Sequence, residues 1–326
     1  MMPTRRPVLA LLLALALAAA GGANAAVPEN APRLRPETRA MLADGDSLTR
    51  AMPPAANATA SVAAASPVLI SRVPADVPQA ALEARLHGVV SVRARVSRLG
   101  LVDSVRVVTG DRRLRESALA SARWWLFAPV AKPVWTTLRI DIDGRPPVDP
   151  LTPDVLAMAH EAERRGAWME AIEAWMGALH RIGKHPSMLN EWAIRDHVIR
   201  LTRRLTSQPR VPGALLTRCQ EARGGQFRTL ARSEHQAFVT IFDDALLSAP
   251  WWADGYQWRA ASLLNCGRGQ DGMRTLMLFR TAAGDRTARS LADRAIAGLA
   301  TGDTLGTAQL LKREGQQFNR DEDADH

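Results

Sequence analysis

The chain contains little cysteine and little lysine, and each shortage excludes a class of protein. Two cysteines in 326 residues are too few for a disulfide-rich scaffold or a four-cysteine zinc site. Lysine occurs only at Lys132, Lys184 and Lys312, so arginine supplies most of the 42 basic residues and is spread from end to end. Because no single stripe gathers this charge, we expect no nucleic-acid partner, although the formal net charge is +9.

Catalytic and metal-binding motifs are also missing from the sequence. There is no Gly-x-Ser-x-Gly elbow and no phosphate-binding loop. His160-Glu161 begins like a zinc-protease helix, but Arg164 stands where the second histidine is needed. The composition is nevertheless globular, with 47% hydrophobic and 23% charged residues. We therefore predict a non-catalytic protein of about two domains, with no catalytic residues, no metal and no cofactor.

The first 25 residues have the features of a secretory signal peptide. Arg5 and Arg6 precede an apolar run at residues 8–20, and Ala23-Asn24-Ala25 has the small residues of a signal-peptidase site. This run of 13 residues is too short to cross a hydrocarbon core of about 30 Å. We predict cleavage after Ala25, a periplasmic location in a Gram-negative cell, and no stable membrane span. The alternative is that the signal is retained as an anchor.

Residues 26–66 have the composition of an Ala/Pro-rich linker. Within them, residues 51–66 hold eight alanines and a Pro-Pro pair, with too little apolar bulk to build a core. The first folded domain is therefore expected from residue 67.

Residues 67–147 predict a small α+β module. Apolar residues alternate with polar ones in two segments, which is typical of half-buried strands. A turn at Gly100 leads from the first of these to another strand, and a helix capped by Asp111 then extends to about Trp125. The inward residues of the three strands are Val90, Val92, Ala94 and Val96; Val102, Val105 and Val107; and Val134, Leu138, Ile140 and Ile142. The prediction is a three-stranded antiparallel sheet with a helix on one face.

The order of these residues resembles the TonB C-terminal domain family, the energy transducers. The resemblance rests on a Gly88-Val-Val strand, the Gly100 turn, the helix pattern Leu114-x-x-x-Ala118-Leu119, and the exit Arg123-x-Trp125-x-Phe127-x-Pro129. It covers about a quarter of the chain. In TonB itself a membrane-spanning helix and a long proline-rich spacer precede the domain, and this sequence shows neither. The resemblance therefore implies the family's fold more strongly than its energy transduction.

The same resemblance implies where a partner binds. In the family the last strand lies at a sheet edge and takes an extended receptor peptide as an added strand. The matching segment here is residues 134–143. It implies a partner-binding edge formed by Val134, Trp135, Thr137, Arg139 and Asp141. Within this set the outward side chains would tune specificity, and Arg139 would pair an acidic side chain. The alternative is that the adjoining domain or a second copy of the chain covers this edge.

Residues 151–302 resemble tetratricopeptide (TPR) repeats, an all-α architecture. Gly166 is followed by small residues and Trp175 at the offsets of the repeat, and Gly267 repeats the phase. The span 186–233 fits poorly, apart from one helix at residues 188–205. A closing helix is expected at 287–299, and a short helix with an acidic tail at 303–326. The tryptophans of these repeats are expected to fill the space between helices.

Two hypotheses about function follow. The first is a non-catalytic periplasmic TonB-like module that docks on envelope partners, TonB-dependent outer-membrane receptors among them, through its sheet edge. The alternative is a TPR-type scaffold whose helical repeats hold the partner; a membrane-anchored energy transducer requires an uncleaved signal. In an oxidising compartment Cys219 and Cys266 would either form one disulfide or remain free as two small core residues.

Overall fold

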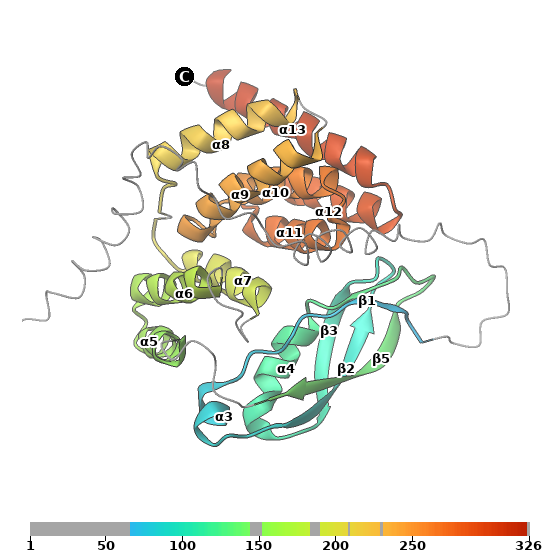
Figure 1. The fold of residues 1–326 in the computed structure, drawn as a ribbon, viewed down its shortest axis with the longest axis vertical. Helices are drawn as coiled ribbons and strands as arrows, with labels where there is room; N and C mark the ends of the chain where they lie inside the picture. Colours follow the sequence, from blue (N-terminus) through green and yellow to red (C-terminus); the bar gives the residue numbers. More distant parts are fainter. Residues whose placement is uncertain (1–65, 144–151, 183–189, 208, 229–230, 325–326) are drawn as a thin grey trace, which may run out of the picture. The chain divides into compact units, whose positions relative to one another are not determined.

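The computed structural model describes residues 66–143, 152–182, 190–207, 209–228 and 231–324 (Figure 1). The predicted signal peptide, and all of the predicted linker but its last residue, lie outside the described residues. Among those that are described, no helix is both long enough and apolar enough to cross a membrane.

Three long strands form the sheet that the sequence predicts. They are β2 (Gly88–Val96), β3 (Val102–Thr109) and β5 (Val134–Ile142), paired antiparallel in the order β3-β2-β5 (Figure 1). The four inward residues of β2 are fully buried, as their alternation indicates. β2 faces Leu138, Ile140 and Ile142 of β5 across the register, so one face of the sheet is apolar.

A short helix covers this apolar face, but it is shorter than predicted. Asp111 caps the 3₁₀ turn that leads into this helix, because its carboxylate accepts the backbone N–H of Arg113 at 2.9 Å. The chain then forms a 3₁₀ turn, η2 (Arg112–Leu114), followed by α4 (Arg115–Ala122). The helix therefore ends before Trp124 and Trp125, both of which are buried in the turn that follows it.

A second, two-stranded sheet was not predicted. β1 (Leu69–Ser71) pairs antiparallel with β4 (Leu126–Phe127), and α3 (Gln79–Glu83) lies between β1 and β2 in the chain. Gly100 sits against β4 with a φ of +77°, and a Cβ there would lie 2.0 Å from the carbonyl oxygen of Phe127. Only glycine fits at this turn.

The rest of the described chain is helical. Gly166 and Gly267, the residues that set the predicted repeat phase, both have positive φ and end the first helix of a helix pair. Trp175 and Trp258 are buried in this region, as expected of interhelix tryptophans. The helices are α5 (Thr152–Arg164), α6 (Trp168–Ile182), α7 (Glu191–Thr202), α8 (Gly213–Gln226), α9 (Arg232–Ser248), α10 (Ala253–Asn265), α11 (Gly269–Ala282), α12 (Arg286–Ala300) and α13 (Thr304–Ala324).

Two helices differ from their predicted lengths. α7 ends at Thr202, shorter than the predicted segment 188–205, of which residues 188–189 lie outside the described residues. α13 has 21 residues and continues through the acidic segment to Ala324, where a short helix and a separate tail were expected. The closing helix at 287–299 agrees with α12.

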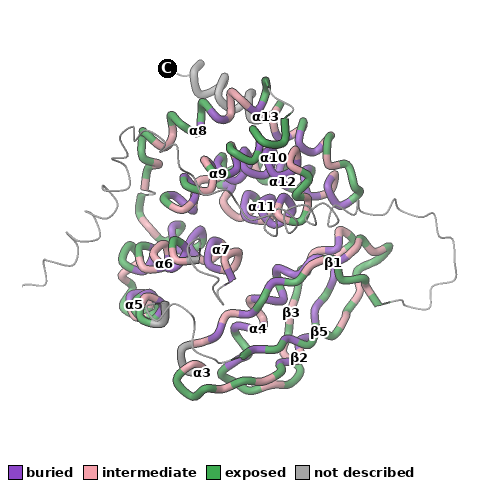
Figure 2. The backbone as a smooth tube through the Cα atoms, viewed as in Figure 1, coloured by how far each residue is buried: buried purple, intermediate pink, exposed green. Residues whose placement is uncertain are grey.

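One apolar core runs from the sheet module into the helices. The same cluster of buried side chains contains residues of β2, α4 and β5 together with residues of α10, α11 and α12. Figure 2 shows buried residues in both the sheet and the helices. The contact between the two parts is specific as well as apolar. Buried Arg274 on α11 donates hydrogen bonds to the carbonyl oxygen of Trp124 at 3.3 Å and to Ser71 Oγ at 2.7 Å. Trp124 also packs on Trp192 of α7, with ring centroids 6.3 Å apart.

Candidate partner-binding edge of the sheet

The strand order places β5 at an edge of the three-stranded sheet. β2 pairs with β5 along its full length, from Gly88 opposite Ile142 to Val96 opposite Val134. On its other side β5 pairs with no strand among the described residues. An edge strand of nine residues presents unpaired N–H and C=O groups, so it can accept one more strand.

The side chains of β5 alternate as the sequence predicts. Leu138, Ile140 and Ile142 are buried against the core, and Val134 and Thr136 are half-buried. The outward side chains are exposed; they are Trp135, Thr137, Arg139 and Asp141. Four of the five residues predicted for the binding edge therefore share the solvent face, whereas Val134 points toward the core.

The ring of Trp135 contacts two arginines, one on β2 and one on β3. The guanidinium carbon of Arg106 lies 5.0 Å from the centre of its ring, and that of Arg93 lies 5.6 Å away. Such cation–π contacts orient both partners. Alternation places both arginines on the outward side of β2 and β3, but it does not show that they meet Trp135, because that contact depends on the pairing of three strands.

The arginines make this face of the sheet basic. Arg93 and Arg106 lie directly opposite each other across β2 and β3, where like charges repel. Arg95 is paired with Asp103 at 3.7 Å, but Arg93, Arg106 and Arg139 make no ion pair with another described residue. We refer to Arg93, Arg106, Arg139 and Trp135 as the basic sheet face.

Trp125 of the family-like signature lies in a buried hydrogen-bond network at the end of α4. The indole N–H of Trp125 donates to the carbonyl oxygen of Val73 at 3.1 Å and to Ser121 Oγ at 3.1 Å, and Ser121 Oγ donates to the same carbonyl at 2.6 Å. This buried network fixes the end of α4 against the segment that precedes α3. The tryptophan of the Trp-x-Phe-x-Pro run is thus a structural residue, not a binding one.

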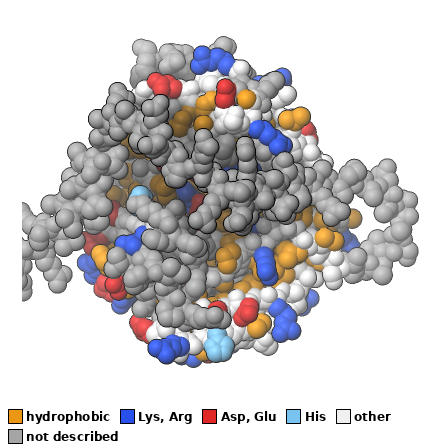
Figure 3. Space-filling model, viewed as in Figure 1, with side chains coloured by type: hydrophobic (Ala, Val, Ile, Leu, Met, Phe, Trp, Pro, Cys, Tyr) orange, Lys and Arg blue, Asp and Glu red, His pale blue; other side chains and the backbone are white. Residues whose placement is uncertain are grey.

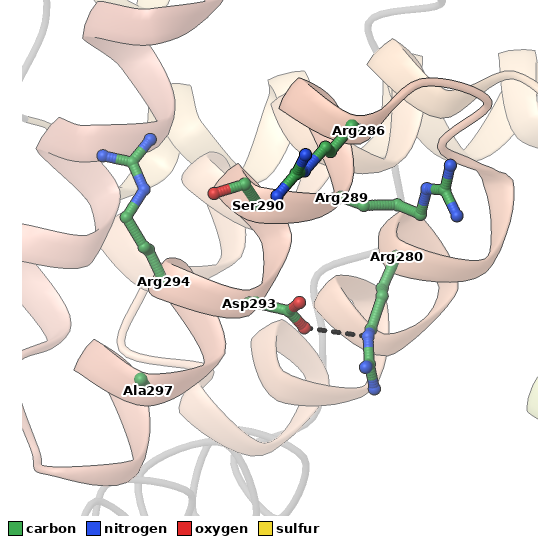
Figure 4. Close-up of a pocket in the computed structure, with 7 residues that line it drawn as sticks. All are labelled: Arg280, Arg286, Arg289, Ser290, Asp293, Arg294 and Ala297. Carbon is green, nitrogen blue, oxygen red and sulfur yellow. Dashed lines mark ion pairs between the residues drawn. The ribbon is translucent and has the colours of Figure 1, made fainter.

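A second candidate site is an arginine-lined hollow between α11 and α12. In Figure 4 the side chains of Arg286 and Arg289 extend from one end of α12, and Arg280 of α11 is paired with Asp293 at 2.8 Å. Arg289 also donates to the carbonyl oxygen of Asp285 at 3.0 Å. Most of the basic groups here are thus engaged by the protein itself. Basic side chains are likewise scattered over the described part of the surface in Figure 3.

Cys219 of α8 and Cys266 at the end of α10 contact different parts of α9. Both thiols are free in this structure. Cys219 of α8 is buried in a cluster with Phe242 and Ala245, while Cys266 Sγ contacts the carbonyl oxygen of Arg232 at 3.6 Å. Ten residues of helix separate Arg232 from Phe242, a rise of about 15 Å, whereas the Cα atoms of a disulfide lie within about 7 Å. In this structure Cys219 is therefore a buried thiol and Cys266 a partly exposed one; whether they are bridged in the periplasm stays a prediction to be tested.

No metal centre is evident in the described residues. Nowhere in them do three His, Cys, Asp or Glu side chains gather in a way that would hold a metal ion. His160 packs edge-on against Trp175, with centroids 5.1 Å apart, so it is an aromatic neighbour within the helical region.

The comparison with protein families agrees with this geometry. The family described as Gram-negative bacterial TonB protein C-terminal matches residues 76–143, which include β2, β3, α4 and β5. No curated protein and no solved structure matches the chain. The match covers about a fifth of the chain, and over this segment the chain is similar to the C-terminal domain of TonB proteins of Gram-negative bacteria. The helical region is consistent with repeats, and the matched segment does not extend into it.

Proposed function

We propose that the protein is a non-catalytic periplasmic binding protein that docks on an envelope partner through the edge of β5. The observation that carries this proposal is the position of β5: its nine residues are paired only with β2 among the described strands. A partner segment can add to this edge through main-chain hydrogen bonds alone. An outer-membrane receptor of the TonB-dependent kind is the partner that the family resemblance favours.

In this proposal the helical region braces the module. Arg274 bonds to the backbone of Trp124, and Trp192 packs on the same tryptophan, so the helices fix the side of the module that carries β1 and β4. The alternative role, in which the helical repeats themselves hold the partner, makes a different demand. It requires partner binding to be insensitive to changes at the β5 edge.

A pair of proline variants tests the edge directly. Successive N–H groups of a strand point to opposite sides, so one of Thr136 and Thr137 offers its N–H to the open edge and the other to β2. Proline removes that donor. Of Thr136→Pro and Thr137→Pro, the variant with the wild-type circular dichroism spectrum is the edge variant. We expect it to lose capture of the receptor from envelope extracts.

The experiment should use the whole chain, because separating the two parts would expose the core they share. The matched alanine variant, at whichever of the two threonines proves to be the edge position, keeps the N–H and should retain binding. If the folded proline variant captures the receptor as well as the wild type does, edge docking is wrong and the helices carry recognition.

A further inference from the structure

The basic sheet face adjoins the proposed docking edge, and its arginines form no ion pair with any other residue that the structure describes. We propose that this face selects a partner segment with acidic side chains at alternate positions. The proposal rests on edge docking and adds the chemistry of the partner: an extended peptide that places Asp or Glu beside Arg139 and Arg93.

The register of the sheet gives the positions of these contacts. A residue of the added strand that lies opposite Arg139 has its Cβ about 5 Å from that of Arg139, within reach of a carboxylate. The next outward position lies opposite Thr137, and Arg93 follows directly behind Thr137 on β2. Strands are spaced by about 4.8 Å, so a glutamate can extend over the short threonine to the long side chain of Arg93.

Trp135 orients Arg93 for its contact with the partner glutamate. Its ring is within cation–π distance of both Arg93 and Arg106, and such contacts orient the guanidinium groups. Flat guanidinium groups held in this way bind carboxylates through two N–H donors at once. Because Arg93 and Arg106 also lie opposite each other in the register, a bound carboxylate relieves their repulsion.

Asp141 disfavours acidic side chains at one end of the docked segment. It is the outward residue nearest the end of β5 and faces Val89 in the register. A carboxylate placed opposite Asp141 is repelled, whereas one opposite Thr137 or Arg139 is attracted. The face therefore favours acidic residues toward the Trp135 end of the docked segment.

Binding of short peptides to the full chain tests the proposal. The probe is a labelled nine-residue peptide, the length of β5, that alternates Glu and Val. Its controls are the same peptide with Gln or Lys in place of Glu, and a single-stranded oligothymidine. In an added strand the Val side chains face the core side, so all acidic groups share the outer face. We expect the Glu peptide to bind about tenfold more tightly than the Gln peptide by fluorescence anisotropy, a preference that declines with added salt.

Variants then assign the preference to the basic sheet face. Arg93→Gln with Arg106→Gln, and separately Arg139→Gln, should each reduce the Glu-over-Gln preference about three- to fivefold. Arg112→Gln removes an exposed charge outside the sheet and should leave the preference unchanged. An equal loss with Arg112→Gln would mean that net charge alone acts, which overturns the proposal.

The remaining outcomes separate this proposal from edge docking. Equal binding of the Glu and Gln peptides, with both lost in the folded proline variant, refutes acidic selection and leaves edge docking intact. Binding of the Glu peptide that survives the edge proline but needs Arg93 and Arg106 refutes edge docking instead. No binding of the Glu peptide at about 1 mM, or arginine-dependent binding of the oligothymidine alone, overturns the inference.

Discussion

The substitution Asp76→Asn is expected to stabilise the protein at alkaline pH but not at acidic pH. Asp76 lies between β1 and α3, and its carboxylate accepts the backbone N–H of Asn190, the N-cap of α7. Burial raises the pKa of this carboxyl from 3.8 to about 7, and the hydrogen bond from Asn190 offsets only part of that rise. The ionised form is therefore unfavourable at a contact that joins the sheet module to the helices.

The sign and size of the effect follow from this shift. Below pH 3.8 the carboxyl is protonated in both the folded and the unfolded chain, so it has no pH-dependent effect. Between pH 3.8 and about 7 the folded protein keeps the proton and the unfolded chain loses it, so stability falls as the pH rises. Above about 7 the loss is complete. A shift of about three pH units corresponds to at most about 4 kcal/mol, and the partial exposure of the residue lowers this limit.

Urea unfolding followed by tryptophan fluorescence, repeated from pH 4 to pH 8, measures this effect. The amide oxygen of Asp76→Asn still accepts the N–H of Asn190, so the variant isolates the charge. We expect its gain in unfolding free energy over the wild type to grow from about zero near pH 4 to about 2–4 kcal/mol at pH 8. Asp103→Asn, which removes an exposed carboxylate, controls for net charge. A gain independent of pH, or a loss at pH 8, would refute the reasoning.

Three further outcomes are expected. Gly100→Ala should destabilise the protein by more than about 3 kcal/mol because its Cβ collides with the backbone, whereas Gly213→Ala, which meets nothing within 4 Å, should not; similar melting curves would contradict this. Arg274→Met should cost about 2–4 kcal/mol in urea unfolding, and a neutral result would mean that the buried guanidinium contributes nothing to the contact between module and helices. Denatured, unreduced protein should titrate two thiols, and in the folded protein Cys219, whose pKa burial raises to about 11, should react more slowly than the less buried Cys266; a disulfide or equal rates would argue against the arrangement described.

The sequence predicts the sheet well because the sheet has a strong local signal. Apolar and polar residues alternate over most of β2 and β5, and the buried sides of both strands are the predicted ones. β1 and β4 were missed because three and two residues are too few for any period to appear. The predicted helix after Asp111 is too long because Trp125 continues its apolar stripe, whereas in the structure the indole of Trp125 bonds to Val73 outside the helix.

At the binding edge, too, local sequence patterns predict only part of the arrangement. The outward residues of β5 follow from alternation, but the basic sheet face depends on which strands lie side by side. Arg93 and Arg106 are separated by a turn in the sequence and meet only through the register of the hairpin. The contact of Arg274 with Trp124 spans 150 residues, and no local pattern indicates it.

The core that continues from the sheet module into the helices means that the peptide chain is not the only connection between them. A protein cut once between Ile142 and Thr152 would leave two fragments that each expose apolar surface complementary to the other. Arg274 and the Trp124–Trp192 contact would then act as recognition elements between separate chains. The two fragments should therefore find each other in solution and reassemble, as the subunits of a heterodimer do.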